Sequence, residues 1–222
     1  MPSSDGILSK GRRAELSERD TVRWFGRHLA DFLTATAPYD SSPAAAEMAR
    51  FEWALGEAFD APNATPVPAA ELIALPAEAW ETLSFVPLPS LHRLLLSFEV
   101  PQAWQKREQV EPGDLEVAAA SGPVPWVIWR PERTTHFRSL EPDEADMLEA
   151  MVEGWTFPEM CGALLPHVGE DQAPARAAGV LRDWVEAGMI ATFAHLASVS
   201  TGAPQAPCLP GSQPAGVRTL LA

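Results

Sequence analysis

Residues 32–59 restrict the fold more than any other part of the chain. Ala37-Pro38 ends a first helix, predicted over Leu16–Thr34, because the residue before a proline is pushed out of the α region. Ser42-Pro43 then predicts the start of a second helix, since serine caps helix N-termini and proline suits the first helical position. The apolar stripe of this second helix comprises Met48, Phe51, Leu55 and Phe59.

Trp53 falls on the side of the second helix opposite this stripe, close to Arg50. A large aromatic residue outside the main stripe requires a packing partner of its own. The pattern therefore predicts contact with another helix or with another subunit.

The rest of the first half is predicted to be helical and irregular. Short helical pieces over residues 69–75 and 77–83 are separated by prolines, and a buried apolar segment leads to a short helix at Gln102–Gln109. Residues 15–110 are therefore expected to form an all-α domain. The stretch 111–125, EPGDLEVAAASGPVP, has no periodicity and is interpreted as a linker.

A second domain is predicted over residues 126–197. Trp126–Arg130 and His136–Leu140 read as the two strands of a hairpin. Three helices follow, over Pro142–Glu153, from Thr156 to Leu165, and over Ala173–Ala187, and the stretch 189–195 is predicted to return as a strand beside the hairpin.

The three helices are delimited by local signals: Gly154 and Gly188 as C-terminal stops, and a Thr156–Glu159 capping box. The order of elements is that of a winged helix-turn-helix. The predicted fold class is thus α+β and mostly α, with a winged-helix-like C-terminal domain, and the Pro/Gly-rich residues 198–222 are expected to be a disordered tail.

The charge balance disfavours nucleic acid as a partner. Sixteen lysine and arginine residues face thirty aspartate and glutamate residues, giving a net charge of −14, whereas duplex binding needs cations that displace phosphate counterions. The third helix of the winged unit offers only Arg176 and Arg182, beside Asp183 and Glu186. A DNA-binding transcription regulator is therefore the alternative interpretation, not the leading one.

Catalytic and metal-binding patterns are not visible in the sequence. The five histidines lack ligand spacing, and Cys161 and Cys208 form no CxxC pair, so no cofactor or metal is predicted in this chain. Ser90 lacks the glycines of a nucleophile elbow and is interpreted as a capping or turn serine. With no secretory signal and no apolar run long enough to span a bilayer, the expected location is the cytoplasm, away from membranes.

The hairpin suggests a peptide-binding role, because an unpaired strand edge accepts an extended peptide. A hairpin that simply covers the helices is the equally weighted alternative. The predicted peptide-binding residues are Trp126, Ile128, Trp129 and Arg130 on the strand, and Leu181 and Trp184 on the third helix.

Four motifs stand out in the first half of the chain. They are the Ala37-Pro38-Tyr39 turn, the run ARFEWALGEAFDAP at Ala49–Pro62, Pro89-Ser90 before a leucine-rich stretch, and Trp104. With these motifs the chain resembles, over Phe25–Gln105, the N-terminal domain of HvfC/BufC-type bacterial proteins, which has been labelled a DNA-binding domain. One departure is visible: Leu88 stands where the family usually has histidine.

This resemblance implies a non-catalytic partner of a multinuclear non-heme iron-dependent oxidative enzyme that modifies a ribosomal precursor peptide. The partner would form a heterodimer with the enzyme, which holds the iron, and would bind the leader of the precursor. Trp53, Arg50 and Tyr39 are the predicted contacts with the enzyme.

Overall fold

The computed structural model describes residues 26–111 and 115–195. It is a mixed α/β protein with two small antiparallel sheets. The α-helices are α2 (Leu29–Ala35), α3 (Pro43–Asp60), α4 (Ala69–Ile73), α5 (Val100–Lys106), α6 (Pro142–Val152), α7 (Phe157–Ala163), α8 (Leu165–Val168) and α9 (Ala173–Glu186). The 3-10 helices are η1 (Tyr39–Ser41) and η2 (Ala77–Glu81). The strands are β1 (Ser84–Pro87), β2 (His92–Phe98), β3 (Ala119–Trp129), β4 (His136–Ser139) and β5 (Ile190–Ala194).

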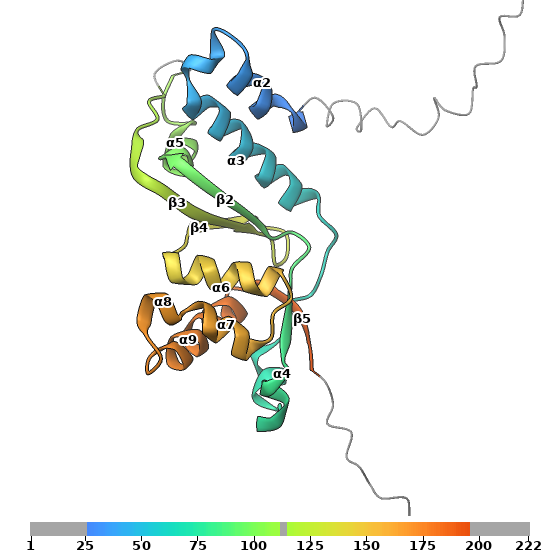
Figure 1. Ribbon diagram of the computed structural model, residues 1–222. Coiled ribbons are helices and arrows are strands. Elements are labelled where there is room, and N and C mark those ends of the chain that lie inside the picture. Colours follow the sequence, from blue (N-terminus) through green and yellow to red (C-terminus); the bar gives the residue numbers. More distant parts are fainter. Residues whose placement is uncertain (1–25, 112–114, 196–222) are drawn as a thin grey trace, which may run out of the picture.

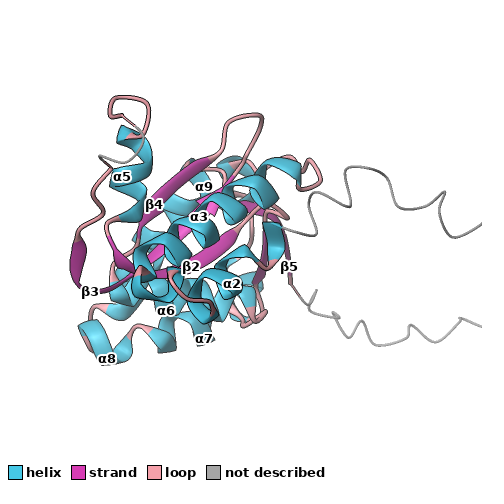
Figure 2. Ribbon diagram, turned by 90° about the horizontal axis from the view of Figure 1, so that it is seen from above, coloured by secondary structure: helices cyan, strands magenta, loops and turns pink. Residues whose placement is uncertain are grey.

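The larger sheet has the strand order β2-β3-β4, and helices cover both of its faces. Helix α3 lies on one side of the sheet, and the group α6–α9 lies on the other (Figures 1 and 2). Since side chains alternate along a strand, neighbouring residues of β3 enter different cores: Val127 packs with the α6–α9 side and Ile128 with the α3 side.

The smaller sheet pairs β1 with β5, so that Phe85 lies opposite Phe193. The prediction of a strand near residues 189–195 is confirmed, but its placement beside the hairpin is wrong. Phe85 and Ile190 are buried in the α6–α9 core, where Trp184 and Met147 also pack, and this burial explains the choice of partner.

The prediction of an all-α first half is wrong, because it contains β1 and β2. Leucine-rich segments have little intrinsic preference for strands. In β2, however, alternate residues face α3: Leu94, Leu96 and Phe98 belong to its core, whereas Arg93 and Leu95 lie on the other face. Tertiary pairing, more than propensity, makes this segment a strand.

The predicted linker at 111–125 is also corrected, since residues 119–125 form the first part of β3. Pro123 and Pro125 made this strand hard to predict from the sequence, because proline is rare inside strands. Strand β4 pairs only with Trp126–Trp129. On the β4 side the Pro125 carbonyl accepts the Leu140 N–H at 2.8 Å, and no N–H of Pro125 is needed there, so proline is tolerated at this end of the ladder. Each sheet therefore contains strands from both of the predicted domains: β1 pairs with β5, and β2 pairs with β3.

Several local predictions are confirmed. Helix α3 begins at Pro43 with Ser42 at the N-cap position, although the Ser42 side chain makes no capping hydrogen bond, and the Thr156–Glu159 capping box opens α7. Gly154 and Gly188 follow α6 and α9 with φ angles of 83° and 66°, a conformation that favours glycine. The first part of the helix predicted at Leu16–Thr34, Cys208 and the tail at 198–222 lie outside the described residues.

The buried face of α3 differs slightly from the predicted stripe. Phe51, Ala54 and Ala58 are buried, whereas Phe59 is 65% exposed. Trp53 is half-buried against Gly26, where an added Cβ would lie 2.7 Å from its ring. A packing partner of Trp53 is therefore the segment that enters α2, which corresponds to the helix option of the prediction.

Candidate functional site

The hairpin predicted at Trp126–Arg130 and His136–Leu140 is present, but its first strand is not an edge. Between Trp126 and Ile128, β3 pairs with β2 on one side and β4 on the other. Both sides of the backbone are occupied by ladder partners, so strand addition at this segment is excluded. The edge strands of this sheet are β2 and β4.

Most of the predicted peptide-binding side chains lie in the protein interior. Trp126 is half-buried, and the other five are buried; they are Ile128, Trp129, Arg130, Leu181 and Trp184. Their burial removes these five side chains from the surface that an extended peptide would contact.

Arg130 holds the C-terminal end of α3 against the sheet. Its guanidinium donates to the carbonyl oxygens of Ala58 at 2.9 Å and Ala61 at 2.6 Å, and to Asn63 Oδ1 at 2.9 Å. Ser90 Oγ accepts from the Arg130 N–H at 3.0 Å and donates to the Arg130 carbonyl at 3.1 Å. Arg130 thus satisfies carbonyl groups left open at the helix end, and Ser90 has the structural role predicted for it.

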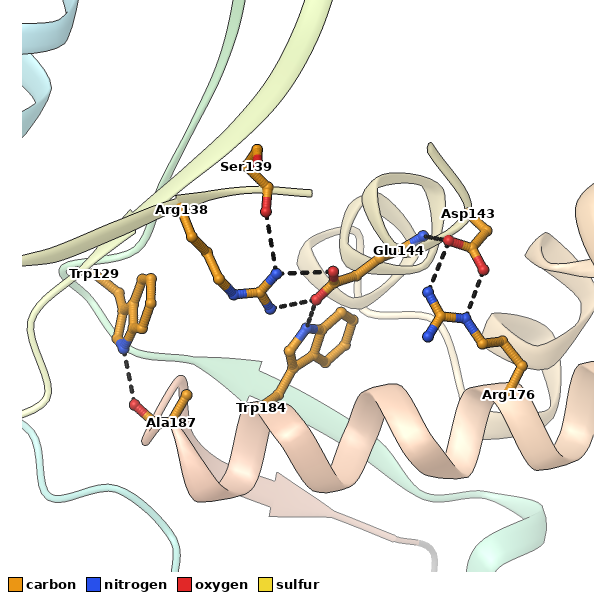
Figure 3. Close-up of polar contacts among 8 residues, drawn as sticks. All are labelled: Trp129, Arg138, Ser139, Asp143, Glu144, Arg176, Trp184 and Ala187. Atoms are coloured by element: carbon orange, nitrogen blue, oxygen red, sulfur yellow. Dashed lines mark hydrogen bonds and ion pairs between the residues drawn. The ribbon is translucent and has the colours of Figure 1, made fainter. Parts of the chain in front are cut away.

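A buried polar cluster joins β4, α6 and α9 (Figure 3). The Glu144 carboxylate accepts both terminal nitrogens of Arg138, one at 2.8 Å, and the Trp184 indole N–H at 2.8 Å. The hydrogen bond to Glu144 raises the pKa of Arg138. Trp129 Nε1 donates to the Ala187 carbonyl at 2.8 Å, so two of the three tryptophans predicted to bind peptide, Trp129 and Trp184, use their N–H groups inside the protein.

Asp143 forms a second ion pair beside this cluster. Its carboxylate accepts Arg176 Nε at 2.6 Å and Nη2 at 2.9 Å, and the Glu144 N–H at 2.7 Å. The bond from Arg176, followed by that from the Glu144 backbone, lowers the pKa of Asp143. One of the two arginines that α9 offers to a DNA phosphate is therefore already engaged.

The best candidate for a binding surface is a groove of about 770 Å³ between β2 and α6. Trp126 lines it, and among the predicted peptide-binding residues it alone does so. The lining residues used below are Arg93, Leu95, Trp126, Asp146 and Glu149, of which Trp126 turns its ring toward Phe137 on the α3 side. This set is called the β2–α6 groove.

The β2–α6 groove combines an exposed apolar side chain with ion pairs on its rim. Leu95 is 66% exposed. Arg93 Nη1 reaches from β2 to Glu149 Oε2 on α6 at 2.7 Å, and His167 Nε2 lies 2.7 Å from Asp146 Oδ2. A site at these residues was not predicted from the sequence. Two signals point to it: Arg93 and Leu95 are two residues apart, as on one face of a strand, and Asp146 and Glu149 are three apart, as on one face of a helix.

Strand β2 forms one edge of this groove, and within the described chain its only strand partner is β3. Glu47 fixes the end of this edge: its buried carboxylate accepts the N–H groups of Ser97 at 2.9 Å and Phe98 at 3.0 Å. The pairing with β3 is irregular between Leu96 and Phe98. The regular part of the β2 edge therefore runs from His92 to Leu96.

Leu181 lines a separate apolar pocket of about 450 Å³ between α4 and α9, together with Ile73, Trp80 and Phe157. The predicted peptide groove joined Leu181 to the Trp126–Arg130 strand. The structure instead places Leu181 toward α4, so the two parts of that prediction do not form one surface.

The predicted contacts with a partner enzyme lie on α3 and η1. Tyr39 is 49% exposed, and its ring lies 5.9 Å from that of Phe32, which is 50% exposed. Leu29 is exposed one turn before Phe32. Leu29, Phe32 and Tyr39 are called the α2–η1 patch; Arg50 is exposed on α3, whereas Trp53 is half-buried.

Leu88, which replaces the histidine usual in the family that the sequence resembles, is a buried core residue. Its N–H donates to the Met189 carbonyl at 2.9 Å. Cys161 is partly buried, and this burial raises the pKa of its thiol. Both features fit packing roles.

Across residues 26–111 and 115–195, no cluster of three or more histidine, cysteine or carboxylate side chains is arranged to hold a metal ion. None of the helices in the described ranges has the length and apolar character needed to cross a bilayer. Comparison of the chain with protein-family models gives no match, and neither does comparison with curated proteins.

Proposed function

We propose that the protein is a non-catalytic partner that binds a precursor peptide and presents it to a multinuclear non-heme iron-dependent oxidative enzyme. The proposal joins the sequence resemblance to two surfaces of the structure. The β2–α6 groove is assigned to the peptide and the α2–η1 patch to the enzyme. The iron belongs to the enzyme, not to this chain.

The observation that carries the peptide assignment is an edge strand bordering a groove. An extended peptide that adds to β2 gains main-chain hydrogen bonds and places alternate side chains into the adjoining hollow. Leu95 lies exposed on this strand, whereas the segment Trp126–Arg130 has both of its sides paired. The proposed peptide site is therefore the edge of β2, not the Trp126–Arg130 segment of β3.

The enzyme assignment is supported by exposed apolar side chains on α2 and η1, which pack against α3 and do not line the β2–α6 groove. Leu29, Phe32 and Tyr39 are each between 45% and 50% exposed, and aromatic residues are enriched at the centres of protein interfaces. Arg50 and Trp53 lie on the neighbouring helix α3.

The finer fold assignment is part of the same proposal. The hairpin, α6, α7 and α9 follow the order of a winged helix-turn-helix, with β5 after them. In this protein we propose that the unit serves peptide recognition. A DNA-reading role is not proposed, because Arg176 on α9 is paired with Asp143.

Co-expression with a tagged multinuclear iron enzyme and its precursor peptide tests the proposal. We expect the three chains to co-purify, and Phe32→Ser with Tyr39→Ser to release the enzyme. Ile73→Ser is the matched control, because Ile73 is 82% exposed on α4 and away from both surfaces. Separate elution of the enzyme and this chain at every salt concentration would reject the proposal. Binding of duplex DNA at low salt, with steep loss as salt rises, would instead favour a regulator.

A further inference from the structure

The β2–α6 groove has a shape that suits an extended segment. The regular edge of β2 spans His92 to Leu96, and on its α6-facing side it presents Arg93 and Leu95. A strand that pairs with this edge places one side chain beside each of them, two residues apart, because the side-chain period of a strand is two.

The position beside Leu95 favours an apolar side chain. Leu95 is 66% exposed, and its ladder partner on β3 is Pro125, which also lines the groove. Covering Leu95 removes apolar surface from water, which is favourable in proportion to the area covered.

The position beside Arg93 favours a cation. Asp146 and Glu149 stand one turn apart on the α6 wall, and their side chains are 61% and 59% exposed. The Arg93 side chain is 34% exposed and pairs with Glu149, and His167 contacts Asp146, so two carboxylates on the α6 wall stand against one arginine and one neighbouring histidine. The net charge of −14 adds a long-range field that attracts cationic segments.

From this arrangement we infer that the β2–α6 groove selects an extended, cationic segment with an apolar side chain at one position and a lysine or arginine two residues away. The inference rests on the proposed function, since it names the chemistry of the peptide bound at the same site. The apolar side chain packs on Leu95, and the cation lies toward Asp146 and Glu149.

Fluorescein-labelled model peptides test this selectivity. The probe TVTKTVTK places valine and lysine alternately on one strand face; TVTETVTE reverses its charge and TSTKTSTK removes its apolar side chains. We expect the first to bind about fivefold more tightly than TVTETVTE, since an exposed ion pair contributes up to about 1 kcal/mol. It should also bind more tightly than TSTKTSTK, because valine covers apolar surface of Leu95 and serine does not. The charge preference should shrink as salt rises.

Matched variants locate the site on the protein. Asp146→Asn with Glu149→Gln should remove or invert the preference for lysine over glutamate, because Arg93 loses its partner. Glu153→Gln, at the C-terminal cap of the same helix and not lining the groove, should leave the preference unchanged. Leu95→Thr should abolish the advantage of valine over serine, whereas Ile73→Thr should not. Circular dichroism checks that each variant is folded.

A local signal separates groove binding from diffuse attraction. The backbone N–H signals of residues 93–95 on β2, assigned in an NMR spectrum, should shift on addition of TVTKTVTK, and the peptide should not shift them in Leu95→Thr. Equal affinity for the lysine and glutamate peptides, or an effect of Glu153→Gln as large as that of the double variant, would overturn the inference. So would a dimer of this chain that Leu95→Thr dissociates in the absence of peptide.

The two proposals fail in different ways. If the iron enzyme co-purifies but the model peptides show no preference, the selectivity is wrong and the partner role stands. If the peptides bind with the expected preference and no iron enzyme co-purifies, the groove chemistry stands and the partner role is wrong.

Discussion

The two faces of the β2-β3-β4 sheet are covered in different ways. On the α3 face, aromatic rings close the interface: Phe51 meets Trp104 and Phe137 edge-on at centroid distances of 5.9 Å and 5.1 Å. On the α6 face, Glu144 and its partners hold the β4 end, while the β2 end stays open at Leu95. Packing therefore dominates one face, and the other divides between a polar anchor and a surface free to bind.

This difference separates stability from recognition within one sheet. The closed face and the polar anchor fix β3 and β4, so that β2 can carry an exposed apolar residue without loss of the fold. Substitutions should therefore have large effects on stability at the α3 face, intermediate effects at the polar anchor and small effects along the β2–α6 groove.

Phe51→Ala should have the largest effect. Phe51 is fully buried, and truncation of a buried phenylalanine costs about 3–5 kcal/mol through lost burial and the cavity left behind. Urea unfolding measures the change, with Leu95→Ala on the opposite face as the control. A loss below about 1 kcal/mol would mean that the α3 face is not closed by this aromatic cluster.

Arg138→Met should cost about 2 kcal/mol, because it leaves the buried Glu144 carboxylate without its cation. Adding Glu144→Gln should recover part of the loss, since the amide oxygen still accepts the Trp184 N–H and no buried charge remains. A double variant as unstable as the sum of the two single variants would contradict this account of the anchor.

Asp143→Asn should lower stability at neutral pH by about 1 kcal/mol, the order expected for a partly exposed ion pair. Since Arg176 lowers the pKa of Asp143 in the folded protein, the pair stabilises the fold above the ordinary carboxyl pKa of about 4. That stabilisation is lost as pH falls through the folded pKa. Urea unfolding of both proteins at a series of pH values should thus show a difference that disappears in acid, and a constant difference would refute the linkage.

Glu149→Gln should have the smallest effect on stability. Its ion pair with Arg93 is exposed, and such pairs contribute about 0–1 kcal/mol. A thermal unfolding midpoint within the scatter of the Glu153→Gln control is the expected result. A loss as large as that for Arg138→Met would show that the pair closes the groove structurally, and would count against a binding surface there.

Elements with strong local signals were predictable from sequence. Helix α3 has its serine and proline at the N-terminus, α7 has a capping box, and α6 and α9 are followed by glycines. These features act within one helical turn, so they operate before tertiary contacts form. The hairpin was predictable for a similar reason, since its strands are close in sequence.

The strands that depend on distant partners were not predictable. His92–Phe98 is rich in leucine, and 119–125 contains two prolines, so neither has the composition of a strand. Each is a strand because the other lies beside it. The peptide-binding prediction failed for the same reason. Trp126–Trp129 was correctly predicted as part of a strand, but it is not an edge strand, because it pairs with β2, which was not predicted from the sequence.

The pairing of β1 with β5 has a consequence for the order of events during synthesis. Ser84 and Ala194 are joined across 110 residues, and such distant contacts form late because a long loop must close first. While the ribosome is still making residues 88–189, β1 has no strand to pair with. A nascent chain arrested before β5 should therefore expose Phe85 to proteases and chaperones, and release of β5 should end that vulnerability.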